Sequence, residues 1–95
     1  MINLLYYNKI PSIATEPGAL THAELSVMIQ LCRMHLVYCK NNYEKEFYLT
    51  DRFLAKAAYV STKTVWKTKK KLVEIGAIKY RIIGNKTYYK IMLES

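Results

Sequence analysis

The sequence predicts a mostly helical α+β fold with three helices, one short strand and a C-terminal β-hairpin. Residues typical of helix N-caps precede three stretches of helical apolar spacing, at Thr21, Thr50 and Ser61. Near the end of the chain, two strand-like runs flank Gly84 and Asn85, a pair typical of a two-residue hairpin turn. These signals place the three helices before the hairpin along the chain.

The whole chain, residues 1–95, is predicted to form a single domain, because its 95 residues leave no room for a second core of useful size. The composition is 52% apolar, which excludes an intrinsically disordered chain. The domain opens with an extended lead-in over residues 1–19, whose two prolines prevent a long helix. Apolar residues at 2–7 favour a short strand there.

The first helix is predicted over residues 21–40. Thr21 and Glu24 have the spacing of a capping box, in which each side chain bonds the other residue's backbone N–H. Apolar residues then cover a wide arc of the helix, which predicts a central helix buried on most sides. The two adjoining apolar stripes are Leu25, Met28, Ile29, Cys32, Leu36 and Cys39, and Val27, Leu31, Met34 and Tyr38.

A short strand and a short helix are predicted next. Residues 45–49 are rich in aromatic side chains and bounded by polar residues, which favours a brief strand with Tyr48 in the core. Thr50 is then the predicted N-cap of a helix over 50–58. The apolar face expected for this helix comprises Phe53, Leu54, Ala57 and Ala58.

The third predicted helix covers residues 61–75 and is strongly basic. Ser61 is its expected N-cap, and Gly76 is placed to end it. Its inward stripe is Val65, Leu72 and Ile75.

A β-hairpin is predicted over residues 77–92. Pairing outward from its turn sets Ile83 opposite Lys86 and Tyr80 opposite Tyr89. Period-two alternation then separates a core face from a basic face. The core face carries Ile78, Tyr80, Ile82, Thr87, Tyr89 and Ile91, and the basic face carries Lys79, Arg81, Ile83, Lys86, Tyr88 and Lys90.

The basic residues are concentrated in the second half of the chain. Residues 1–51 carry four basic and five acidic side chains, whereas residues 52–95 carry eleven basic and two acidic ones. A net charge of +8 distributed in this way indicates a polyanionic partner, and nucleic acid first. The alternative is a solvated basic face that serves solubility.

Several other classes of protein fit the sequence poorly. No apolar stretch is long enough to span a membrane, and no secretory signal pattern begins the chain, so a cytoplasmic, nucleoid-associated protein is expected. No nucleophile–base pair, carboxylate pair or phosphate-binding glycine loop is evident, so we expect neither an enzyme nor a cofactor. Cys32, His35 and Cys39 share one helical face, but three ligands on one rigid helix cannot surround a zinc ion. They are therefore expected to be buried thiols and a tolerated histidine, with no metal.

The order of elements is that of a winged helix-turn-helix, in which the third helix enters the major groove of duplex DNA. On that helix, the candidate contacts are Ser61, Thr62, Lys63, Thr64, Trp66, Lys67, Lys70 and Lys71. On the preceding helix, Arg52 and Lys56 are candidates for phosphate contacts. On the hairpin, or wing, the candidates are Lys79, Arg81, Asn85, Lys86 and Lys90.

The sequence also resembles a known family. Residues 49–65, LTDRFLAKAAYVSTKTV, resemble winged helix-turn-helix domains of bacterial, phage and plasmid replication proteins. They are especially similar to the amino-terminal domains of phage replisome-organiser and primosomal initiation proteins. Residues 71–78, KLVEIGAI, and the lead-in YNKIP at residues 7–11 extend the similarity. The resemblance implies site-specific recognition of duplex DNA in the initiation of replication.

Three positions depart from that family or leave a choice. Tyr59 occupies a turn position that usually holds glycine. Lys69 occupies an often apolar position, so that Thr68 or the lysine's methylene stem must fill the space. Trp66 either contacts DNA or packs against the wing.

Two further functions remain open on the sequence alone. One is a transcriptional repressor of the same build, and the other is a winged helix that binds an acidic protein within a larger complex. Expected partners are duplex DNA, a second copy of the chain as a homodimer, and other replication proteins; no membrane and no small-molecule substrate is expected. Stacking on single strands is disfavoured, because several tyrosines are expected in the core. These are Tyr38, Tyr48, Tyr80 and Tyr89.

Overall fold

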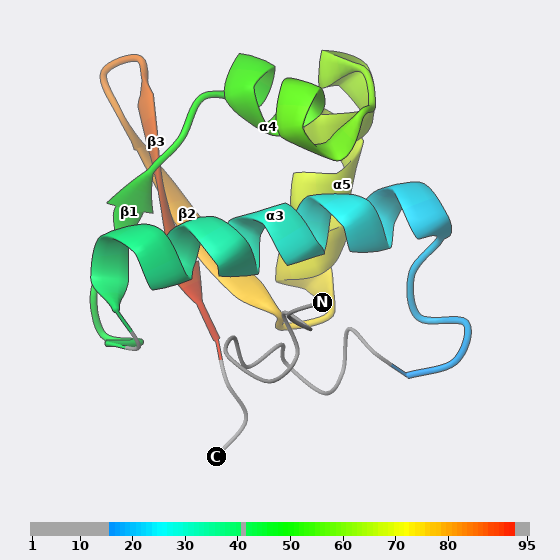
Figure 1. Ribbon diagram of the computed structural model, residues 1–95, viewed down its shortest axis with the longest axis horizontal. Helices are drawn as coiled ribbons and strands as arrows, with labels where there is room; N and C mark the ends of the chain where they lie inside the picture. The colour runs from blue at the N-terminus through cyan, green and yellow to red at the C-terminus, as the bar shows by residue number, and fades with distance from the viewer. Residues whose placement is uncertain (1–15, 41, 93–95) are drawn as a thin grey trace.

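The computed structural model describes residues 16–40 and 42–92, and these residues contain three helices and three strands (Figure 1). The predicted strand at 2–7 and most of the lead-in lie outside the described residues. The strands form an antiparallel sheet in the order β1-β3-β2. This is the predicted α+β arrangement of a winged helix-turn-helix. The elements are α3 (His22–Cys39), β1 (Phe47–Tyr48), α4 (Asp51–Ala58), α5 (Thr62–Glu74), β2 (Ile78–Ile83) and β3 (Lys86–Ile91).

Helix α3 begins at the predicted capping box. The Thr21 N–H donates to Glu24 Oε1 at 2.8 Å, and the Glu24 N–H donates to Thr21 Oγ1 at 3.2 Å. The buried face of α3 is narrower than predicted, and the expectation of a buried Tyr38 is wrong, because 58% of its surface is exposed. The buried residues of α3 are Val27, Met28, Leu31, Cys32, His35 and Cys39.

Helices α4 and α5 are capped by the predicted hydroxyls. Thr50 Oγ1 accepts from the Phe53 N–H at 3.0 Å, and Ser61 Oγ accepts from the Thr64 N–H at 3.1 Å. The turn between the helices closes without glycine, because Tyr59 itself adopts the left-handed conformation with φ 58°. Phe53 is 42% exposed and does not belong to the buried face, contrary to the prediction. That face consists of Leu54, Ala55 and Ala58.

The hairpin has the predicted register, including Ile83 opposite Lys86 and Tyr80 opposite Tyr89. Its core face is shorter than predicted. Ile82 is 64% exposed, because the hairpin extends beyond the helices that cover its base. Tyr48 on β1, which was also expected in the core, is 40% exposed. Only the part of the hairpin nearest α5 and α3 therefore contributes to the core, through Ile78, Tyr89 and Ile91.

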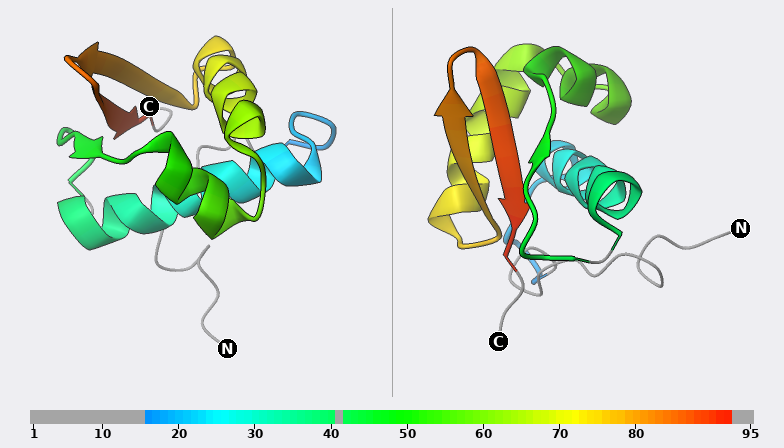
Figure 2. Two further views of the ribbon diagram at one scale, coloured as in Figure 1. Left: turned by 90° about the horizontal axis from the view of Figure 1, so that it is seen from above. Right: turned by 90° about the vertical axis from the view of Figure 1, so that its left-hand side faces the viewer.

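The core lies between the helices and the sheet. Figure 2 shows the three helices gathered on one side of the sheet, with α5 beside the hairpin and α3 beside β1. Within the described residues, no helix is long and apolar enough to cross a bilayer. The side chains with almost no exposed surface include Met28 and Leu31 of α3, Leu54 of α4, Val65 and Leu72 of α5, and Tyr89 of β3.

Candidate nucleic-acid interface

The outward side of α4 and α5 carries five exposed basic side chains. On α5, the buried positions Val65, Thr68, Lys69 and Leu72 occupy one side of the helix. The remaining side points outward, as the helical phase predicts. None of the five cations forms an ion pair with a carboxylate of residues 16–40 and 42–92. We name these residues the helical basic face: Arg52, Lys56, Lys63, Lys67 and Lys70.

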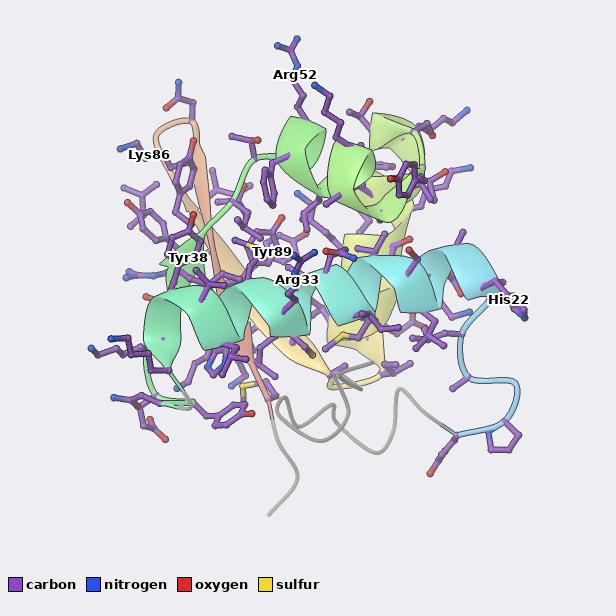
Figure 3. The ribbon with its side chains drawn as sticks, in the orientation of Figure 1. His22, Arg33, Tyr38, Arg52, Lys86 and Tyr89 are labelled. Atoms are coloured by element: carbon purple, nitrogen blue, oxygen red, sulfur yellow. The ribbon has the colours of Figure 1, made fainter. Side chains whose placement is uncertain are left out.

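Arg52 lies at the start of α4 and extends away from the body of the protein (Figure 3). It lies at the same end of the molecule as the hairpin turn. A long cation that extends into solvent beside a helix N-terminus is suited to a phosphate contact.

Trp66 lies within the helical basic face and is 51% exposed, so it does not fill a gap against the wing. The Lys70 ammonium lies 3.6 Å from the centroid of its ring, within the range of a cation–π interaction. This contact holds the indole on the outer side of α5, where its free edge is presented together with Lys63 and Lys67.

The other predicted polar contacts at the start of α5 differ in their availability. Thr62 is exposed, but Ser61 and Thr64 are engaged with each other as well as with the helix cap. The two hydroxyl oxygens lie 3.0 Å apart. Thr62 is therefore the hydroxyl in this turn that remains open to a base or a phosphate.

Lys69 is turned inward and is only 4% exposed. Its ammonium lies 2.8 Å from Asp51 Oδ1, at the first residue of α4. The same ammonium lies 5.3 Å from the ring centroid of Tyr80 and 5.8 Å from that of Tyr89, on the two hairpin strands. Thr68 is also buried, so Thr68 and the stem of Lys69 both fill the space for which the sequence offered them as alternatives.

The Lys69 pair connects the helix-turn-helix to the wing. Burial raises the pKa of the neighbouring Tyr89, and the Asp51 carboxylate raises it further, so the tyrosine hydroxyl stays protonated. A cation that bonds α4 and contacts both hairpin strands fixes how the wing is set against α5. The sequence marks Lys69 as unusual, but it gives no sign of its partner Asp51, which is 18 residues away.

Lys71 was expected at the interface, but it points towards α3. Its ammonium lies 3.0 Å from Glu24 Oε1. Although burial acts to raise the pKa of Glu24, hydrogen bonds from the Thr21 N–H and from Lys71 lower it overall. Lys71 is thus neutralised within the protein and is not brought together with Lys67 and Lys70.

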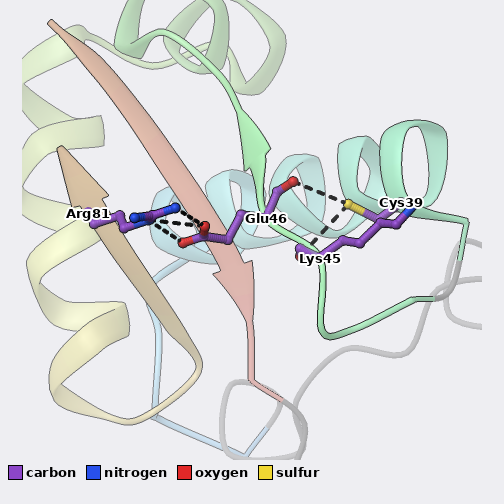
Figure 4. A network of polar contacts seen from close by, with 4 residues as sticks. All are labelled: Cys39, Lys45, Glu46 and Arg81. Carbon is purple, nitrogen blue, oxygen red and sulfur yellow. Dashed lines mark hydrogen bonds and ion pairs between the residues drawn. The ribbon is translucent and has the colours of Figure 1, made fainter. Parts of the chain in front are cut away.

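The wing cations divide into two pairs. Arg81 donates to both carboxylate oxygens of Glu46, at 2.9 Å from Nε and 2.6 Å from Nη2 (Figure 4). The Lys90 ammonium lies 3.4 Å from Glu44 Oε2. The Glu46 carboxylate raises the pKa of Arg81. Lys79 and Lys86 have no such partner among the described residues.

Glu44 and Glu46 are residues that sequence reasoning missed. They precede β1, and they reach the hairpin only because β1 pairs with β3 through Phe47 opposite Tyr89. The Cys39 thiol also holds this segment, since it lies 3.9 Å and 3.8 Å from the carbonyl oxygens of Lys45 and Glu46 (Figure 4). The signal available in the sequence was the net negative charge of residues 1–51.

The three residues considered as metal ligands have other partners in the structure. His35 stacks on Tyr43 with ring centroids 4.3 Å apart, and its Nε2 lies 3.2 Å from the Asn42 carbonyl oxygen. Burial raises the pKa of the Cys32 thiol to about 12. Among the described residues, no group of three His, Cys, Asp or Glu side chains is arranged to hold a metal ion.

The chain was compared with protein-family models and with curated proteins. No protein-family model matches the chain, and no curated protein matches it in sequence.

Proposed function

We propose that the protein binds duplex DNA, with α5 in the major groove and α4 and the wing against the flanking backbone. The observation that carries this proposal is the helical basic face, whose five cations have no acidic partner among the described residues. Cations left unpaired on one face can neutralise phosphates and release counterions on binding. Helix α5, which carries three of these cations, has the width that the major groove accepts.

The recognition is proposed to be sequence-specific. Thr62, Lys63, Trp66 and Lys67 lie at the beginning of α5, the part of such a helix that meets base edges. Trp66 adds an apolar edge to the hydrogen-bond donors around it. The resemblance to phage and plasmid replication proteins supports a role in replication initiation, as a cytoplasmic, nucleoid-associated protein that acts with other replication proteins.

A selection from a random duplex pool tests this proposal. The retained fraction is sequenced, and a common motif is expected; the parent protein should then prefer that motif over a scrambled duplex. Lys67→Gln should weaken binding to the motif, whereas Arg33→Gln, an equal charge change at an exposed position on α3, should not. If the pool shows no enrichment and no duplex binds, the proposed function is wrong.

A transcriptional repressor would use the same interface, so the position of the selected motif distinguishes the two roles. A motif that repeats within a replication origin supports an initiator, and a motif that overlaps a promoter supports a repressor. The protein-interaction alternative predicts that no duplex is retained and that an acidic polypeptide competes for the helical basic face.

A further inference from the structure

The end of the wing carries two large apolar side chains in solvent. Ile82 is 64% exposed and Ile83 is 52% exposed. They are consecutive residues on opposite faces of β2, paired with Thr87 and Lys86. Both lie beyond the last core pair of the hairpin, Tyr80 and Tyr89, so neither side chain is required for packing. We name residues 82–86, including the turn at Gly84 and Asn85, the wing tip.

The wing tip and the DNA-facing helices lie at one end of the molecule. In Figure 1 and in the right-hand view of Figure 2, the hairpin turn rises to the same end as α4 and the beginning of α5. Figure 3 shows Lys86 beside the turn and Arg52 at this same end. A duplex that meets the helical basic face is therefore within reach of the wing tip.

The wing cations differ in whether a carboxylate pairs with them. Below the tip, Arg81 and Lys90 are paired with Glu46 and Glu44, whereas Lys79 has no such partner among the described residues. At the tip, Lys86 has no carboxylate partner within the part of the chain that the structure describes, and its ammonium lies 5.5 Å from the Tyr48 ring centroid. The tip thus combines an apolar end with an available cation, which suits a narrow groove lined by phosphates.

We propose that the wing tip enters the minor groove and that Ile83, which shares a face of the hairpin with Lys86, wedges into a base step there, bending the duplex away from the wing. Apolar side chains that enter the minor groove partly unstack one step and kink DNA toward the major groove. This inference rests on the proposed function. Docking of the tip on a second copy of the chain is disfavoured, because it would bring the unpaired Lys86 and Arg52 of two strongly basic molecules together.

Energy transfer between dyes at the two ends of a selected duplex tests the wedge. The parent protein is expected to shorten the end-to-end distance, by a bend in the range of roughly 20–90° seen for such wedges. The double variant Ile82→Thr/Ile83→Thr keeps β-branched residues in the strand and should still bind, with affinity lowered less than about tenfold, but should leave the duplex straight. Val37→Thr, the same kind of change at an exposed position on α3, should bend DNA like the parent.

A second measurement uses only the parent protein. The fluorescent base 2-aminopurine, placed in turn at each position flanking the motif, should brighten at one or two adjacent positions where the wedge unstacks the duplex. A bound but straight duplex, or no brightening at any position, overturns the wedge and leaves DNA binding intact. Sedimentation that shows a dimer lost in the double variant assigns the tip to self-association and also overturns it. Failure to bind any duplex overturns both the wedge and the proposed function.

Discussion

The helical basic face and the wing carry similar numbers of cations but differ in what those cations meet. The five of the helical basic face have no acidic partner among the described residues, whereas Arg81 and Lys90 of the wing are paired with Glu46 and Glu44. The paired acids come from the segment before β1, which is far from the hairpin in sequence and adjacent to it in the sheet. The charge distribution along the sequence therefore shows which segments are basic, but not which of their cations are left without a carboxylate partner.

This difference is the basis of the separate roles proposed for the two regions. The helices present unpaired cations and an exposed indole, which suits recognition. Two of the wing cations, Arg81 and Lys90, are held in internal ion pairs, and the exposed Ile82 and Ile83 lie at the tip. Lys69 connects the regions, because its ammonium bonds Asp51 and contacts the rings of Tyr80 and Tyr89.

The largest expected effect comes from breaking that connection. Lys69→Ala removes a partly buried ion pair and two cation–π contacts and leaves space where the stem was, so the free energy of unfolding should fall by about 2–4 kcal/mol. Lys69→Met retains the volume and leaves Asp51, which is 36% exposed, able to reach water, so it should lose less than about 1.5 kcal/mol. Urea unfolding of both variants measures the difference. Equal stability of the two variants would show that the volume filled by the lysine stem contributes nothing measurable to stability.

Binding by the helical basic face should respond next. Lys63→Ala or Lys67→Ala should weaken binding to a selected duplex by ~1–3 kcal/mol if either lysine contacts a base, since each lies on the outward side of the first turns of α5. Titration of labelled duplex measures the dissociation constants, with Arg33→Ala as the control on α3. If both variants bind as tightly as the parent, α5 is not the recognition helix.

The paired and unpaired wing cations should differ in their effect on salt dependence. Each neutralised phosphate contributes about 0.9 to the slope of log affinity against log salt. Changing Lys79 and Lys86 together to Gln should make the slope shallower by up to roughly two units, equally on specific and scrambled duplexes. Changing Arg81 and Lys90 to Gln should change it by less than about one unit, because these cations already meet carboxylates. An equal change in both double variants would mean that DNA displaces the internal pairs.

The sequence predicted the local features well, because their causes are local. Thr21, Thr50 and Ser61 cap the three helices as expected, and the Gly84 and Asn85 turn sets the observed register. The features that the sequence did not predict depend on how the elements pack against one another in space. A period of two assigned Ile82 to the core face, but the helices do not extend far enough to cover it.

The candidate site followed the same rule. The outward phase of Lys63 and Lys67 is a property of one helix and could be predicted. The pairing of Lys71 with Glu24 and of Arg81 with Glu46 requires residues 47 and 35 positions away in sequence. An aromatic-rich segment predicted β1 correctly, yet nothing in it indicated that Tyr48 would stay exposed at the edge of the sheet.

The segment between α3 and β1, whose Glu44 and Glu46 pair with wing cations, should become less stable as the pH falls. His35 stacks on Tyr43 and meets Phe47 edge-on, and burial lowers its pKa, although its hydrogen bond with the Asn42 carbonyl opposes the shift. The unfolded chain then binds the proton more tightly, so stability is fully present above the unfolded pKa of about 6.5 and is lost as the pH falls below it, towards the lower folded pKa. The slope from this one group cannot exceed about 1.4 kcal/mol per pH unit.

Thermal unfolding between pH 7.5 and 5 measures this dependence. His35→Phe should flatten it over that range, with its own stability at pH 7.5 serving as the reference. If parent and variant lose stability in parallel, the dependence arises from other groups, and the anchoring of the segment after α3 is insensitive to protonation.

The smallest effect should come from the turn of the helix-turn-helix, where Tyr59 adopts φ 58° with 94% of its surface exposed. A side chain in the left-handed region costs about 1–2 kcal/mol, and glycine relieves this cost but gives the unfolded chain roughly 0.4–1 kcal/mol of extra entropy. Tyr59→Gly should therefore stabilise the protein by about 0.5–1 kcal/mol, since no packing is lost. The urea midpoint of the variant measures this gain. Tyr38→Gly, at an exposed position inside α3, is an opposite control that should destabilise the protein by about 1 kcal/mol. A loss of stability in Tyr59→Gly would mean that the tyrosine makes a contact worth more than its backbone strain. A loss of DNA affinity at unchanged stability would instead place Tyr59 in the DNA interface beside the helical basic face.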